Sequence, residues 1–358
     1  MKKVFIKDIK ERDKVNDLFL VAKKDTGVSK AGKAYLNLNF MDSTGSMEAR
    51  VWDNAEAIAR GFEAGDIVKA RGYALSYRGV VQLNIAAIER VSESESSPTD
   101  FLPSSRLKPG EMIKDLDKVI ATISEPSVKA LLEAIFQDPD VRQRFKIAPA
   151  AKAMHHAFIG GLIEHVLSIC SVVDFVAAHY KKDLEINRDL LLAGAILHDI
   201  GKIYELSYAS FFDYTDEGKL IGHITIGVEL VNKKAAGIPG FPEEVRMAVN
   251  HLILSHHGVL EYGSPKRPKI PEAIILAFLD DMDAKVAALR VMTEGREEGT
   301  NWTPYQRMFE RPIYTGLMGK MEEAAGEAEE EPAAEKIKER DAEAEPRDDS
   351  PGDLGLFK

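Results

Sequence analysis

The sequence predicts two folded parts, an N-terminal all-β barrel and an all-α helical bundle, followed by a disordered acidic tail. A length of 358 residues suits about two domains. Near the N-terminus apolar and polar residues alternate, which is the period of half-buried strands. From about residue 110 apolar residues recur at helical spacing instead. Residues 321–358 are rich in Glu, Ala and Pro, and we expect them to bury too little apolar surface to fold alone.

Five strands are expected in the first part. Residues 35–40 show the pattern best, because Leu36, Leu38 and Phe40 face one side while Tyr35 and two asparagines face the other. The other expected strands are residues 17–24, 47–53, 67–75 and 80–88, with a short helix at residues 54–60. Five strands and one short helix in this order predict an OB-fold barrel over residues 1–91.

The run GKAYLNLNFMDSTGSMEARVWD resembles nucleic-acid-binding OB domains of the anticodon-binding type. Such barrels hold single strands with a basic groove and aromatic stacking platforms. The candidate contacts are Lys33, Tyr35, Arg50, Trp52, Tyr73, Tyr77 and Arg78. The competing interpretation is that Trp52 and Tyr73 fill the barrel and that the basic side chains are merely solvated.

The net charge of −11 is unevenly distributed. Residues 321–358 hold 14 acidic and 5 basic residues, whereas residues 1–91 hold 16 basic and 12 acidic residues. A nucleic-acid partner is therefore not excluded. The single cysteine, Cys170, excludes a disulfide framework, and no signal-like segment or run of 18 uncharged apolar residues occurs. We expect a cytoplasmic protein without a membrane partner.

Residues 92–106 are rich in Ser, Glu and Pro and predict a linker, so the helical domain is expected over residues 107–320. Within it, residues 188–199 are apolar nearly all round, which predicts a buried helix that ends in His198 and Asp199. A buried carboxylate beside a buried imidazole is unfavourable unless both have partners, and a metal ion can serve both. His165 in the preceding apolar helix is a third candidate ligand.

Three further polar groups follow on successive helical stretches: His223, the run SHHG with His256 and His257, and the run LDDMDAK with Asp280. A lone histidine on an apolar helix is more often a core residue than a ligand. The ordered set, however, resembles the HD-domain metal-dependent phosphohydrolases, of which HDIGK is a typical central motif.

This resemblance implies a first divalent metal bound by His165, His198, Asp199 and Asp280. A second would take Asp199 as a bridge, His223, and one or both of His256 and His257. The sequence leaves open one or two ions per chain, and manganese, cobalt, iron or magnesium. Asp199 and Lys202 are the catalytic candidates. Lys202 would hold a phosphate oxygen, or else be a solvated charge.

The stretch HHAFIGGLIEH, with the barrel and the SHHG run, resembles the YhaM-type 3′→5′ exoribonucleases over residues 1 to about 315. In that pattern Asp280 matches the metal-binding Asp and Asp283 a second one, and His156 lines the site. The resemblance implies degradation of single-stranded RNA, and of single-stranded DNA as a further option, to nucleoside 5′-monophosphates.

Two alternatives remain. One is an HD phosphohydrolase of free or signalling nucleotides with a regulatory OB domain, and the other is a non-catalytic single-strand-binding protein. The complete set of candidate ligands argues against the latter, and the barrel argues against the former. Whether the chain forms a homo-oligomer stays open.

Overall fold

A computed structural model describes residues 2–29, 32–92, 98–152, 156–208, 212–294 and 300–316. The chain divides into two compact units, Met1–Gly295 and Arg296–Lys358. The predicted acidic tail, residues 321–358, lies outside the described residues. The predicted domain boundaries near residues 91, 106 and 320 stay predictions.

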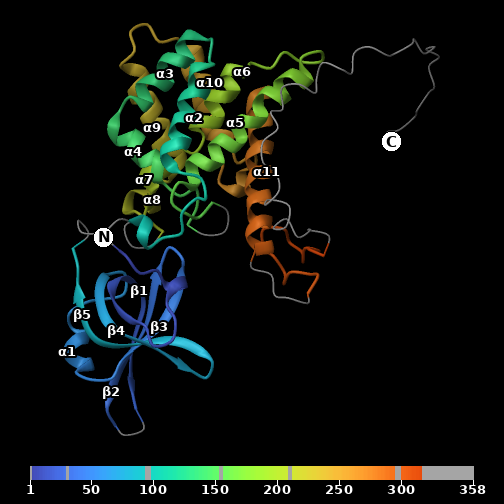
Figure 1. The fold of residues 1–358 in the computed structure, drawn as a ribbon. Coiled ribbons are helices and arrows are strands. Elements are labelled where there is room, and N and C mark those ends of the chain that lie inside the picture. The colour runs from blue at the N-terminus through green and yellow to red at the C-terminus, as the bar shows by residue number, and fades with distance from the viewer. Residues whose placement is uncertain are drawn as a thin grey trace, which may run out of the picture. The chain divides into compact units, whose positions relative to one another are not determined.

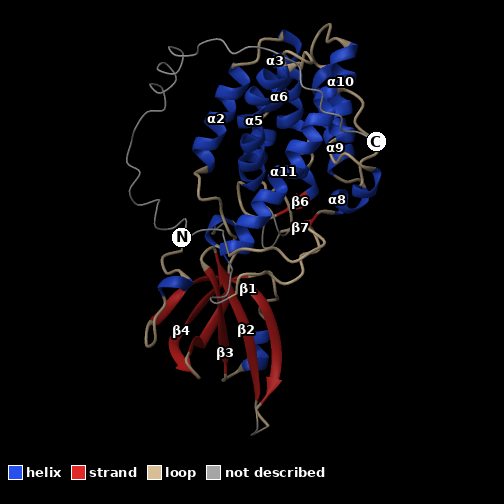
Figure 2. Cartoon of the chain, turned by 90° about the vertical axis from the view of Figure 1, so that its right-hand side faces the viewer, coloured by secondary structure: helices blue, strands red, loops and turns tan. Residues whose placement is uncertain are grey.

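Five N-terminal strands form a closed barrel in the order β1-β2-β3-β5-β4 (Figures 1 and 2). The strands are β1 (Lys14–Val28), β2 (Ala34–Asp42), β3 (Gly45–Val51), β4 (Ile67–Tyr77) and β5 (Val80–Arg90), with the short helix α1 (Ala55–Ala59) between β3 and β4. Only β3 and β5 pair in parallel among these neighbours. The predicted barrel is confirmed.

Side-chain alternation along β2 builds the barrel core. Leu36, Leu38 and Phe40 are buried, and Phe40 stacks on Phe19 with ring centroids 5.3 Å apart. Tyr35 and Asn37 lie between them on the opposite face and stay partly exposed. The face of β2 with Tyr35 and Asn37 is therefore accessible to a ligand.

The following helices pack around a single large apolar core (Figure 2). They are α2 (Pro109–Ala121), α3 (Pro126–Phe136), α4 (Pro139–Ile147), α5 (Gly161–Tyr180), α6 (Arg188–Leu197), α9 (His223–Ala236), α10 (Glu243–Ser255) and α11 (Pro271–Glu294). Helix α6 is buried nearly all round, as its composition predicts.

Short elements between α6 and α9 were not predicted. They are α7 (Lys202–Glu205), β6 (Leu206–Ser207), β7 (Asp213–Tyr214) and α8 (Asp216–Leu220). Each is too short for a periodic pattern to show. The described part of the predicted linker also differs from a plain connector, since Phe101 and Leu102 are buried in a cluster with Leu18, Leu20 and Ile159.

By length and composition alone, α5 could cross a membrane. Its residues Leu162, Val166, Ile169 and Val173 are buried in the helical core, however. A core helix of a folded domain passes the same test, so α5 is weak evidence for a membrane span.

Candidate metal centre and nucleic-acid face

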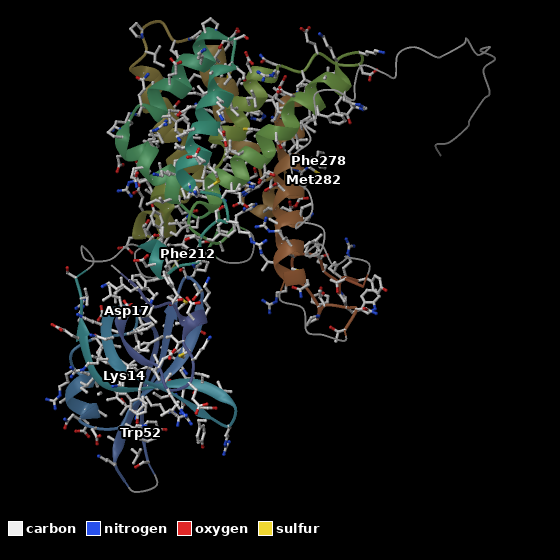
Figure 3. All side chains as sticks on the ribbon, viewed as in Figure 1. Lys14, Asp17, Trp52, Phe212, Phe278 and Met282 are labelled. Carbon is white, nitrogen blue, oxygen red and sulfur yellow. The ribbon has the colours of Figure 1, made fainter. Side chains whose placement is uncertain are left out.

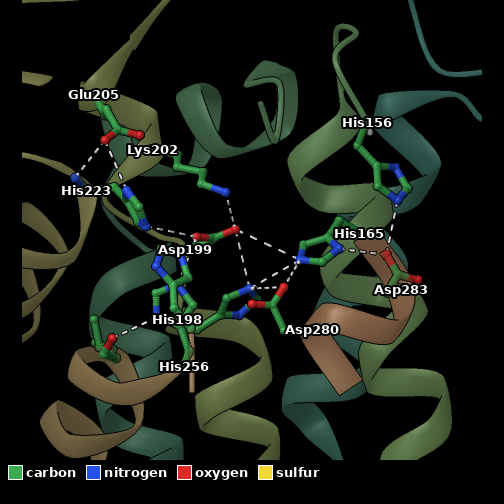
Figure 4. A network of polar contacts seen from close by, with 12 residues as sticks. His156, His165, His198, Asp199, Lys202, Glu205, His223, His256, Asp280 and Asp283 are labelled. Carbon is green, nitrogen blue, oxygen red and sulfur yellow. Dashed lines mark hydrogen bonds and ion pairs between the residues drawn. The ribbon is translucent and has the colours of Figure 1, made fainter. Parts of the chain in front are cut away.

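Asp199 lies at the centre of a buried network of polar side chains (Figure 4). Helix α6 ends at Leu197, so His198 and Asp199 follow at its C-terminal end, where they are 0 % and 1 % exposed. Gly201 lets the start of α9 approach closely, because a Cβ there would lie 2.0 Å from the carbonyl oxygen of His223. This glycine is what allows His223 to reach Asp199.

The first group of atoms surrounds Nε2 of His165. This nitrogen lies 3.2 Å from Nε2 of His198, 3.2 Å from Oδ1 of Asp280 and 3.9 Å from Oδ2 of Asp199. Ligands at about 2.1 Å from one ion in octahedral geometry are about 3 Å apart. The spacing of this group is thus close to that of a coordination shell.

The second group surrounds the other oxygen of Asp199. Oδ1 of Asp199 lies 3.5 Å from Nε2 of His223 and 3.6 Å from Nε2 of His256. His223, His256 and His257 form a cluster whose geometry could hold a metal ion. Three buried atoms, Asp199 Oδ1, His223 Nε2 and His256 Nε2, have no hydrogen-bond partner. Buried polar atoms are rarely left so, and a shared cation would satisfy all three.

Hydrogen bonds at Nδ1 fix how these imidazoles point. Nδ1 of His198 donates to the carbonyl of Ala195 at 3.0 Å, and Nδ1 of His256 donates to that of Ile253 at 2.7 Å. In the neutral ring Nε2 is then the nitrogen with the free lone pair, and it faces the network, as a metal ligand requires.

Sequence reasoning missed Glu205, which orients His223. Its Oε1 lies 3.0 Å from both the backbone nitrogen and Nδ1 of His223. Glu205 is in a four-residue helix 18 positions away, so no spacing rule pointed to it.

Asp283 contacts Nδ1 of His165, the ring nitrogen that faces away from the first group. Its Oδ2 accepts from Nδ1 of His165 at 2.7 Å and from Nε2 of His156 at 3.1 Å, and Ser168 Oγ donates to its Oδ1. Asp281, on the same helix, is exposed and pairs with Lys285. The structure therefore brings Asp280 and Asp283 to the site and leaves Asp281 outside.

The network keeps its carboxyl groups ionised. Burial opposes the charge of Asp199, but interactions led by that with Lys202 hold the pKa of that carboxyl well below its usual range. Burial likewise opposes the charge of Asp280, but interactions led by the hydrogen bond with His165 outweigh it, so its pKa is lowered. Both groups are anionic at neutral pH and suited to a cation.

The pKa values of His256 and His165 shift in opposite directions. Burial lowers the pKa of His256 well below its ordinary value. Burial would also lower the pKa of His165, but hydrogen bonds to Asp280 and Asp283 outweigh it and raise that pKa to about 9. The raised pKa favours the protonated form of His165 at neutral pH when no metal is bound.

Lys202 is placed against Asp199. Its Nζ donates to Oδ2 of Asp199 at 2.6 Å, and its side chain is 14 % exposed. The alternative of a solvated charge is therefore wrong for the metal-free protein. A contact with a phosphate oxygen stays a prediction.

Five of the barrel candidates lie on one face: Tyr35, Arg50, Trp52, Tyr73 and Tyr77. Asn37 pairs with Arg50, Arg50 with Asn84, and Asn84 with Tyr73, so these residues form one row across β2, β3, β5 and β4. Trp52 follows on the same face, 39 % exposed (Figure 3). It does not fill the barrel, and neither does Tyr73 at 48 % exposure.

Aromatic and basic side chains alternate along this face. Tyr35 stacks on Trp52 with ring centroids 4.9 Å apart, and the Arg50 guanidinium lies 5.9 Å from the Trp52 ring and 5.7 Å from the Tyr77 ring. Arg78 also lies over Tyr77, at 5.4 Å. Lys33 is instead engaged by Asp53 at 2.7 Å.

Two family models match the two folded parts of the chain. Residues 162–285 match the HD domain, and residues 20–91 match the OB-fold nucleic acid binding domain. Among solved structures, the second OB-fold domain of replication protein A from Methanococcus maripaludis is 19 % identical, with a TM-score of 0.21, over 26 % of this chain and 96 % of that one. Rim1, a mitochondrial single-stranded DNA binding protein from S. cerevisiae, is 13 % identical, with a TM-score of 0.21, over 23 % and 97 %.

One curated relative spans nearly the whole chain. It is the 3′-5′ exoribonuclease YhaM of Geobacillus sp. (strain WCH70), which is 35 % identical over 316 residues, 87 % of this chain and 95 % of the relative. Both domains and their order are accounted for by this match. The chain therefore belongs to the YhaM family of exoribonucleases, which join an OB-fold domain to an HD domain.

Proposed function

We propose that this protein is a metal-dependent 3′→5′ exoribonuclease that degrades single-stranded RNA, and single-stranded DNA as a second substrate, to nucleoside 5′-monophosphates. The observation that carries the proposal is the set of three unpartnered buried atoms on Asp199, His223 and His256, beside the first group around His165. The relative's printed activity agrees with it.

Two ions fit this donor set. The first would be held by His165, His198, Asp199 and Asp280. The second would be held by Asp199, His223, His256 and His257. Mixed imidazole and carboxylate ligands suit manganese, cobalt, iron or magnesium. When bound, such ions supply an activated water and stabilise charge on the phosphate oxygens.

The chain's own residues prepare this chemistry. Glu205 and Asp283 fix the orientation of His223 and His165. Lys202 places a positive charge 2.6 Å from Asp199, where it could contact a phosphate oxygen of the bound strand. The face formed by Tyr35, Trp52 and Tyr77 would stack the bases of that strand. The single buried thiol is compatible with a reducing cytoplasm, where we place the protein.

The test is digestion of 5′-labelled single-stranded RNA with manganese. Wild type should give a descending ladder and nucleoside 5′-monophosphates, and a 3′-phosphorylated RNA should resist. Asp199→Asn should abolish the ladder and lower the bound metal, because it removes the one charge shared by both groups. Asp281→Asn is the matched control and should digest normally. Turnover near wild type by the Asp199 variant would refute the assignment.

A further inference from the structure

A groove of about 420 Å³ runs along one face of α10. Its lining on the helix recurs every three or four residues, so these side chains share a face. The lining residues are Glu243, Arg246, Met247, Asn250, His251 and Leu254 of α10, with Lys266 and Lys269 opposite.

The wall opposite α10 is strongly basic. The run SPKRPK over residues 264–269 contains Lys266 and Lys269, which line the groove, with Arg267 between them, and no acidic residue. Throughout the ranges that the structure describes, the side chains of these three residues form no ion pair and no hydrogen bond, and all three are exposed. Three uncompensated cations within four residues favour an anionic ligand.

The basic wall is held in place before any ligand arrives. The backbone nitrogen of Lys266 donates to the carbonyl of Leu254 at 3.3 Å, and that of Lys269 donates to Nε2 of His251 at 2.9 Å. Burial, helped by the nearby Lys269, lowers the pKa of His251, so its imidazole is neutral and can accept. Pro265 and Pro268 further restrict the backbone. The backbone of this wall therefore needs little ordering when a ligand binds.

The floor of the groove is partly apolar, in contrast to its basic wall. Met247 is 61 % exposed although it is apolar, and Leu254 lies beside it in the lining. Asn250, also in the lining, keeps a buried Oδ1 with no hydrogen-bond donor. Apolar surface and a cationic wall together match a nucleotide, which offers a flat base and a phosphate.

We propose that this groove binds a nucleotide of the single strand outside the hydrolysed end, with its phosphates against Lys266, Arg267 and Lys269 and its base over Met247. The inference rests on the proposed function, because it assigns a path to the strand that the metal centre would shorten. It adds a binding surface on the helical domain to the face on the barrel.

The test is equilibrium binding of a labelled single-stranded RNA by the full chain at several salt concentrations, without turnover. One variant changes Lys266, Arg267 and Lys269 to Gln. The matched control changes Lys181, Lys182 and Lys233 to Gln and removes the same charge from other exposed positions. Each lost phosphate contact should reduce the salt slope by about 0.7 and the three together should weaken binding roughly tenfold or more at low salt. The control should keep the wild-type slope.

Two further arms separate the outcomes. Met247→Ala should weaken strand binding a few-fold and Met247→Phe should restore it, since an aromatic ring can also support a base. Equal salt slopes for the groove and control variants would overturn the proposal. So would a groove variant that loses only binding of free nucleoside 5′-monophosphate, because the groove would then serve a mononucleotide. Loss of strand binding with normal hydrolysis of a dinucleotide supports the groove, whereas absence of hydrolysis in wild type refutes the proposed function alone.

Discussion

Nδ1 of His165 and Oδ2 of Asp283 are 2.7 Å apart, so the carboxylate accepts a hydrogen bond from the imidazole and turns Nε2 toward His198 and Asp280. This is a carboxylate–histidine pair behind a candidate metal ligand, an arrangement that fixes the tautomer and raises ligand basicity.

We expect Asp283→Ala to weaken metal binding by about 10–100-fold, because His165 loses the acceptor that orients it. Asp283→Asn keeps one acceptor oxygen and should restore part of the affinity. Equilibrium dialysis of the metal-stripped protein against Mn²⁺ measures both. Asp281→Ala, two positions away on the same helix and exposed, is the control. Equal affinities for the Ala variants at 281 and 283 would show that Asp283 has no positioning role.

The barrel face makes a second prediction. Trp52→Ala should weaken binding of single-stranded RNA by about 1–3 kcal/mol, the usual contribution of one base stacked on an aromatic ring. Trp52 is suited to this because it is partly exposed and already stacked on Tyr35, which holds its ring in place. Fluorescence anisotropy with a labelled oligonucleotide gives the affinity.

Tyr180→Ala is the matched control for Trp52, since it removes an exposed aromatic ring from the end of α5. Hydrolysis of a dinucleotide should be unchanged in both variants, because neither residue touches the metal groups. The barrel face is not the strand platform if the two variants bind long RNA equally well.

A third prediction concerns stability and pH. Burial opposes the charge of Asp189, but the backbone N–H groups of Glu125 and Ser124, followed by Arg188, outweigh it and lower the pKa of this carboxyl. Because the folded-state pKa lies below the unfolded value near 3.8, the added stability is present above about pH 4. It is lost as the pH falls through the folded-state pKa.

Asp189→Ala should therefore lower the free energy of unfolding by about 1–2 kcal/mol at pH 7, since it also leaves two backbone donors without their partner. The difference from wild type should shrink at pH 3. Urea unfolding at the two pH values measures it. Asp183→Ala, an exposed position shortly before α6, should change neither value. A deficit that does not depend on pH would mean that the charge of Asp189 is not the stabilising feature.

Much of the metal centre could be predicted from the sequence, and the reason is visible in the residues. His198 and Asp199 end an apolar helix, and a polar pair at that place needs a partner. His165, His223, His256 and Asp280 lie on or at the ends of other apolar helices, and the structure brings all of them to Asp199 or its neighbours.

The supporting contacts could not be predicted in the same way. Glu205 and Ser168 act through hydrogen bonds that join positions 18 and 115 residues apart, which no local period encodes. Lys202 follows Asp199 by three residues, and its pairing with that carboxylate depends on how α7 begins. On the barrel, alternation predicted which side of β2 is buried, but the strand ends differ because hydrogen bonding continues beyond the apolar pattern.

The last prediction concerns paired substrates. Asp199 and His256 are each 1 % exposed, so the phosphate to be cleaved must enter a site enclosed by helices. A base that meets the barrel face must likewise be unstacked.

Opening a duplex costs roughly 1–2 kcal/mol for each base-pair step, and several steps together should stall the enzyme. We expect a hairpin with a single-stranded 3′ tail to be shortened to near its stem and then to accumulate. A time course with a 5′-labelled stem-loop tests this, with an unpaired RNA of the same length as control. Passage through a stable stem at the rate of the unpaired control would refute the model in which only a single strand enters, even if the nuclease activity were confirmed.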